Sequence, residues 1–133
     1  MRYDHTAVQV SDIDASIEFY TSNLGFKLMS LETSEELKMR FAFLELEGSK
    51  FELIEDLRGN FVKPRLAEPY CPHYCFEVDD MDAALRQLHD QGIEILSGPI
   101  DLPGEVFVYF TDPDDNVLEY IQWKNHLDST SAQ

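Results

Sequence analysis

The chain of 133 residues is acidic, with 26 Asp and Glu against 10 Lys and Arg and a formal net charge of −16. This length suits one compact domain, and a hydrophobic content of 44% is enough to form a core. The acidity argues against nucleic acid or an anionic membrane as a partner, because both are bound through Lys and Arg. We find no run near the ~20 apolar residues that span a membrane and no signal-peptide pattern, so we expect a cytoplasmic protein.

The two halves of the sequence share one pattern. Residues 5–17 align with 73–85, and five aligned positions are identical, His5 with His73 among them. After a one-residue deletion the register continues and aligns residues 51–54 with 118–121. A long period with only two copies predicts a domain of two paired modules rather than a solenoid.

The first half predicts one helix and four strands. In the strand at 6–10, alternation places His5 on the face opposite the apolar positions. A helix capped by Ser11 or Asp12 follows, with an apolar stripe at helical spacing, and Gly25 stands where it should stop. Three more strand-like runs complete this half: 26–30, 37–45 and 50–54.

The second half repeats this order. Asp79 or Asp80 caps its helix, and Gly92 stands at its end. Its later strand-like runs are 94–97, 105–111 and 117–123, with a turn at 112–116.

We therefore predict an α+β fold in which two tandem βαβββ modules form a curved mixed sheet around a metal pocket, with the helices outside. We expect a single domain over residues 1–127. Its parts are a first module at about 1–58, a connecting loop at about 59–70, a second module at about 71–123 and a polar tail at 124–133.

Two imidazoles and two carboxylates occupy equivalent positions in the repeat. His5 and His73 begin the first strand of each module, whereas Glu52 and Glu119 lie in each last strand. Alternation directs all four away from the helix-covered face. Four such groups brought together would desolvate and repel badly without a cation, and a divalent metal removes that problem. Glu55 lies on the opposite face and is expected to be an exposed carboxylate.

The remaining His and Cys residues favour a metal site less. His89 and His126 have no counterpart in the repeat and are expected at the surface. Cys71, His73 and Cys75 would share one face of a strand, but such positions are roughly 6.5–7 Å apart, too far for one metal to gather all three. We expect Cys75 to be a pocket-wall or core thiol.

The sequence resembles the vicinal oxygen chelate superfamily, which includes glyoxalase I, methylmalonyl-CoA epimerase, extradiol dioxygenases, and fosfomycin- and bleomycin-resistance proteins. The resemblance covers about residues 3–123. It is carried by HTAVQVSDI at 5–13, SIEFY at 16–20, LGF at 24–26, FELIE at 51–55 and DPDDNVLE at 112–119. The opening and the final segment look most like bacterial glyoxalase I. One departure is Asp115, where many relatives have Gly.

The resemblance implies metal ligation by His5, Glu52, His73 and Glu119, with Ni, Co, Mn or Zn as the ion. It points to Glu119 as the base that moves a proton while the metal stabilises an enediolate. The implied activity is that of a metal-dependent lyase or isomerase, similar to lactoylglutathione lyase, on a 2-oxoaldehyde thiol adduct. No convincing glutathione-binding set is matched. Arg40 is either a contact for an anionic substrate group or an exposed strand charge.

Other functions fit the same resemblance. They are an acyl-CoA epimerase of the methylmalonyl-CoA type and a non-catalytic antibiotic-sequestering protein, whereas the fourth ligand counts against an extradiol dioxygenase. The resemblance also implies a homodimer with modules paired across chains, so the four ligands would meet either within one chain or across two.

Overall fold

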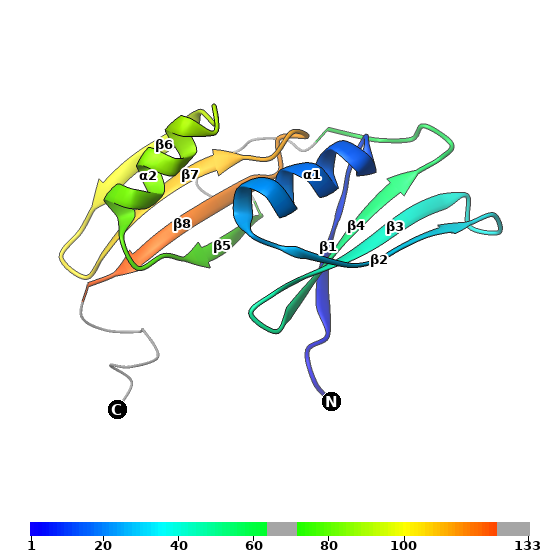
Figure 1. Cartoon of the computed structure of the whole chain (residues 1–133), viewed down its shortest axis with the longest axis horizontal. Helices are drawn as coiled ribbons and strands as arrows, with labels where there is room; N and C mark the ends of the chain where they lie inside the picture. The colour runs from blue at the N-terminus through cyan, green and yellow to red at the C-terminus, as the bar shows by residue number, and fades with distance from the viewer. Residues whose placement is uncertain (64–71, 125–133) are drawn as a thin grey trace. The chain divides into compact units, whose positions relative to one another are not determined.

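The computed structural model describes residues 1–63 and 72–124. The chain divides into two compact units, Met1–Pro64 and Arg65–Gln133. Within the described residues, each unit contains one helix and four strands in the order βαβββ, as Figure 1 shows. No helix in this part of the chain is long and apolar enough to cross a membrane. The predicted α+β fold of two βαβββ modules is confirmed.

The first unit is a four-stranded mixed sheet with one helix. The strand order is β1-β4-β3-β2, with β1 parallel to β4 and the other neighbours antiparallel. Its elements are β1 (His5–Gln9), α1 (Ile13–Leu24), β2 (Lys27–Ser34), β3 (Met39–Leu46) and β4 (Ser49–Asp56).

The second unit has the same topology, with the strand order β5-β8-β7-β6 and β5 parallel to β8. Its elements are β5 (His73–Glu77), α2 (Met81–Asp90), β6 (Ile95–Asp101), β7 (Glu105–Thr111) and β8 (Val117–Trp123). The predicted bounds of β7 and β8 are met to the residue. Strands β2 and β6 run beyond the predicted ends at 30 and 97, because their ladders with β3 and β7 continue to Ser34 and Asp101.

Aspartate side chains start both helices. Asp12 accepts a hydrogen bond from the backbone N–H of Ala15 at 3.1 Å, and Asp80 accepts one from Ala83 at the same distance. These contacts satisfy amides that have no partner within the helix. Gly25 ends α1 in the left-handed conformation, as predicted. Helix α2 ends at Asp90 with Gln91 as its C-cap, and Gly92 follows in the left-handed conformation at φ +73°.

Each helix covers one face of its own sheet. Helix α1 packs against β2, β3 and β4, and α2 packs against β8. In the first unit, the buried ring of Tyr20 contacts Phe26 and Phe51 at centroid distances of 5.6 and 5.3 Å. In the second, Leu88 of α2 and Leu118 of β8 are both fully buried. These buried apolar residues of each sheet therefore lie on its helix side.

A tight turn precedes β8. The buried carboxylate of Asp112 accepts hydrogen bonds from the backbone amides of Asp114 and Asn116, both at 2.9 Å, and from the Asn116 side chain at 2.8 Å. Asp115 adopts φ +65°, a conformation that glycine takes at least cost. The turn fixes where β8 begins, and hence where Glu119 lies along it.

Candidate functional site

In the first unit, His5 and Glu52 meet on the sheet face opposite α1. His5 Nε2 lies 3.1 Å from Glu52 Oε1, although 47 residues separate them. The parallel pairing of β1 and β4 sets Ala7 beside Glu52, so that His5 is the diagonal neighbour on the same face. The Glu52 side chain is 13% exposed, which leaves its carboxylate largely out of water.

The second unit repeats this arrangement. His73 Nε2 lies 3.0 Å from Glu119 Oε1, and the parallel pairing of β5 and β8 sets Cys75 beside Glu119. The Glu119 side chain is only 9% exposed. The repeat in the sequence is therefore also a repeat in geometry, and each unit carries one His–Glu pair.

An aromatic ring packs against each imidazole. The ring of Phe43 lies 5.0 Å from that of His5, and the ring of Tyr109 lies 5.4 Å from that of His73, both nearly perpendicular. Phe43 is the register partner of Glu52, and Tyr109 is the register partner of Glu119. These contacts restrict the tilt of each imidazole.

The donor atoms of each pair suit a divalent cation. An imidazole nitrogen and a carboxylate oxygen near 3 Å can share a proton, and when both are unprotonated they can bind one cation together. Imidazole nitrogen and carboxylate oxygen are ordinary ligands of Zn, Ni, Co and Mn. Across the described ranges, no three or more His, Cys, Asp or Glu side chains group closely enough to hold a metal ion. Each unit by itself thus offers two ligands.

The second ring nitrogen of His5, Nδ1, also contacts a carboxylate. Asp4 Oδ2 lies 2.7 Å from His5 Nδ1, and Lys50 Nζ donates a hydrogen bond to Asp4 Oδ1 at 2.9 Å. Hydrogen bonding to His5 and Lys50 lowers the pKa of Asp4. The hydrogen bond with Asp4, supported by the charge of Glu52, raises the pKa of His5.

Cys75 lies beside Glu119 on the same sheet face. The residue is exposed within its unit, so the core position is wrong and the pocket-wall position stays a prediction. Partial burial of the thiol and the neighbouring Glu119 carboxylate raise the pKa of Cys75 to about 12. In the metal-free protein, Cys75 is therefore a protonated thiol at neutral pH. Cys71 lies outside the described residues.

Glu55 is not the exposed carboxylate that its sequence position predicted. Its side chain is 16% exposed and accepts a hydrogen bond from the backbone N–H of Ile13, the first residue of α1, at 3.0 Å. The equivalent contact in the second unit joins Gln122 to the amide of Met81 at 2.7 Å. A polar residue at this position in both halves was the signal that sequence reasoning missed.

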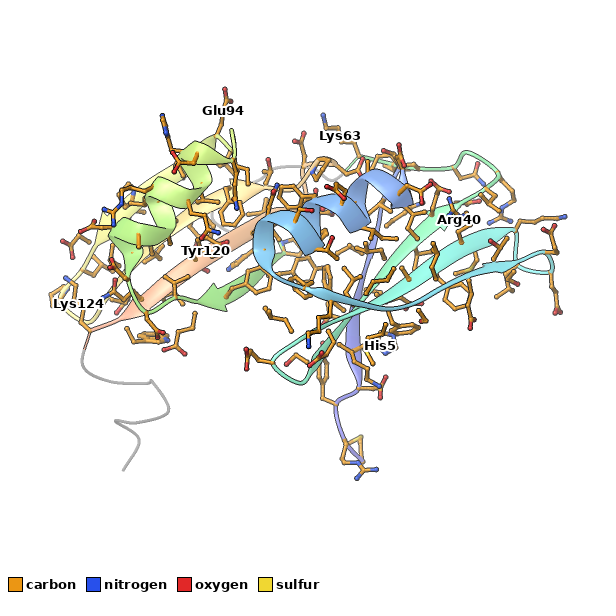
Figure 2. All side chains as sticks on the ribbon, viewed as in Figure 1. His5, Arg40, Lys63, Glu94, Tyr120 and Lys124 are labelled. Atoms are coloured by element: carbon orange, nitrogen blue, oxygen red, sulfur yellow. The ribbon has the colours of Figure 1, made fainter. Side chains whose placement is uncertain are left out.

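Arg40 lies on the helix-covered face of the first sheet. Its guanidinium donates two hydrogen bonds to Asp14, at 3.1 and 3.3 Å, and its register partner on β4 is Glu55. Figure 2 shows Arg40 near α1 and His5 on the other side of the sheet. Arg40 is therefore a paired charge that faces away from Glu52, and this position does not support the predicted contact with substrate.

The other two histidines do not join these pairs. His89 is 91% exposed on α2, which confirms its expected surface position. His126 lies outside the described residues.

Comparison with known proteins identifies the family. Residues 2–120 match the Glyoxalase/Bleomycin resistance protein/Dioxygenase superfamily, and the chain belongs to it. Lactoylglutathione lyase of Neisseria meningitidis serogroup A is 30% identical over 100% of this chain and 99% of its own length. The protein of that name from Escherichia coli O157:H7 is also 30% identical, over 94% of this chain and 95% of its own.

Solved structures agree with this assignment. The glyoxalase family protein from Enterococcus faecalis superimposes with a TM-score of 0.76 at 26% identity, over 90% of this chain and 96% of its own. The resemblance to the vicinal oxygen chelate superfamily, and distantly to bacterial glyoxalase I, is confirmed.

Proposed function

We propose that this protein is a metal-dependent lyase or isomerase of the glyoxalase I type, which acts on a 2-oxoaldehyde thiol adduct. The observation that carries the proposal is the duplicated His–Glu pair, His5 with Glu52 and His73 with Glu119, at equivalent positions of two equivalent sheets. The full-length similarity to proteins named lactoylglutathione lyase supports it.

In this proposal, the two pairs hold one divalent ion, which is Ni, Co, Mn or Zn. His5, Glu52, His73 and Glu119 would hold the ion, which would also bind water or substrate oxygens. When bound, the metal supplies Lewis-acid stabilisation of negative charge on substrate oxygens.

Glu119 is the proposed base. One of its carboxylate oxygens takes the proton from the carbon that bears the hydroxyl and sulfur and returns it to the adjacent carbonyl carbon. The hydroxyl proton moves to the former carbonyl oxygen, so the reaction is an isomerisation that needs no external oxidant or reductant. Its low exposure keeps bulk water from the transferred proton. The protonated Cys75 thiol, hydrogen-bonded to Glu119, helps to hold the carboxylate in place.

We further propose a homodimer, with one chain's first module beside its partner's second module, and a cytoplasmic location. In that assembly His5 and Glu52 come from one chain, and His73 and Glu119 from the other. Assembly within one chain is the alternative.

The substrate assignment is tested with Ni- and Zn-loaded protein, methylglyoxal, and glutathione or another thiol. We expect formation of the 2-hydroxyacyl thioester, and a loss of about 10²–10⁴-fold in the Glu119→Gln variant. The Glu55→Gln variant, altered on the helix side of the sheet, should keep the wild-type rate. Inactivity with every thiol would refute the substrate.

Two further assays identify the alternatives if that result is negative. Exchange of the α-proton of methylmalonyl-CoA into deuterated water would indicate an acyl-CoA epimerase. Thermal stabilisation by an antibiotic, without turnover and without bound metal, would indicate a sequestering protein.

A further inference from the structure

The His5 ring lies between two carboxylates at different distances. Asp4 Oδ2 is 2.7 Å from Nδ1, whereas Glu52 Oε1 is 3.1 Å from Nε2. A neutral imidazole carries one proton, which the two carboxylates compete for. The shorter contact favours Nδ1–H donating to Asp4, which leaves the Nε2 lone pair directed toward Glu52.

Lys50 holds the Asp4 carboxylate in this position. Its ammonium donates to the second carboxylate oxygen of Asp4 at 2.9 Å, and Lys50 is the register partner of His5 on β4. Asp4 is otherwise in an exposed segment before β1, with 65% of its side chain accessible. Lys50, which holds Asp4, therefore lies on the same strand as Glu52.

The second unit differs at this point. The residue before His73 is Pro72, whose side chain has no hydrogen-bond acceptor, and the register partner of His73 is Val117. The two His–Glu pairs share their geometry but not this support. Pro72 and Val117 thus provide neither a carboxylate nor an ammonium at the positions equivalent to Asp4 and Lys50.

We propose that Asp4, held by Lys50, is a positioning residue that fixes His5 in the Nδ1–H tautomer and so presents Nε2 to the cation site beside Glu52. Carboxylates that accept from the far nitrogen of a metal-bound imidazole commonly contribute 10–100-fold in metal affinity. The effect on metal affinity depends on the proposed metal function, whereas the effect on the tautomer does not.

The test uses the full chain and the variants Asp4→Leu and Asp4→Asn. The first readout is the His5 tautomer in metal-free protein, from ¹⁵N NMR at a pH above the titration of the imidazole. The second is Zn²⁺ affinity, from competition with a chelator. Asp90→Asn is the matched control, because Asp90 is also exposed, at 81%, and lies 3.6 Å from the neighbouring His89.

We expect the wild type to be mainly the Nδ1–H tautomer and Asp4→Leu to shift toward Nε2–H. Zn²⁺ affinity should fall about 10–100-fold in Asp4→Leu and less in Asp4→Asn, which keeps an acceptor, with no change in Asp90→Asn. An unchanged tautomer in Asp4→Leu would overturn the inference. If the wild type binds Zn²⁺, an unchanged Zn²⁺ affinity in Asp4→Leu would overturn it as well. A wild type that binds no Zn²⁺, with a tautomer that still depends on Asp4, would refute the metal function and support the positioning role.

Discussion

The carboxylate of Glu55, on the last strand of the first unit, accepts a hydrogen bond from the backbone amide of Ile13 at the start of α1. The side chain of Gln122 makes the same contact with Met81 at the start of α2. In both units one polar side chain of the last strand ties the helix to the sheet and satisfies an amide that has no partner within the helix.

This relationship predicts different effects for two substitutions of one residue. Glu55→Ala leaves the part-buried amide of Ile13 without its acceptor and should destabilise the protein by about 1–3 kcal/mol. Glu55→Gln should cost less than about 1 kcal/mol, because Gln already fills this role at position 122. Urea unfolding followed by circular dichroism measures both. Equal losses in the two variants would contradict the role given to the acceptor.

Asp56 and Arg58 predict a pH dependence of stability. Hydrogen bonds from the Arg58 side chain and backbone, at 2.9 to 3.2 Å, lower the pKa of Asp56 to about 2. Since the ordinary value is near 3.9, folding favours the ionised form. The stabilisation is therefore present above about pH 4 and is lost as the pH falls toward 2.

The measurement is the difference in Tm between wild type and Asp56→Asn across this range. The variant should be less stable at pH 7, and the difference should shrink below pH 4. Arg58→Gln should show the same loss at pH 7. A difference that does not vary with pH would argue against the ion pair as its cause.

We predict that removing the Cys75 thiol does not affect metal binding. The equivalent of Cys75 in the first unit is Ala7, which likewise lies beside the strand glutamate. Since Ala7 can provide no ligand at the equivalent position, Cys75→Ala should leave the metal stoichiometry unchanged. The Co²⁺-loaded wild type should show no intense thiolate-to-cobalt charge-transfer band. The appearance of that band, and its loss in Cys75→Ala, would make Cys75 a ligand.

Strand alternation predicted the sheet face of each His–Glu pair, because a side-chain period of two follows directly from the order of residues. The predicted exposure of Glu55 was wrong, because alternation does not reveal that a carboxylate near a strand end can reach a helix amide. The contact between Asp4 and His5 could not be predicted from the sequence either. Neighbours in sequence point to opposite faces in a regular strand, and only the irregular segment before β1 lets Asp4 turn back to the ring.

The assembly of the two pairs predicts the outcome of mixing two inactive variants. His5→Ala lacks a ligand in the first module, and His73→Ala lacks one in the second. If modules pair across chains, a mixed dimer has one intact set of four ligands, and metal binding should partly return after the variants are unfolded and refolded together. Assembly within one chain predicts no recovery. Each variant refolded alone is the control.

The most direct test of the account is metal analysis of purified wild type beside His5→Ala and Glu119→Gln, after equilibration with Ni²⁺ or Zn²⁺. His5 lies in the first unit and Glu119 in the second. If both units bind the same ion, either substitution should weaken its binding. A metal site shared by the two modules should hold one divalent ion per set of four ligands in the wild type and much less in both variants. A wild type that binds no divalent ion, or variants that bind it as tightly as the wild type does, would contradict a shared site.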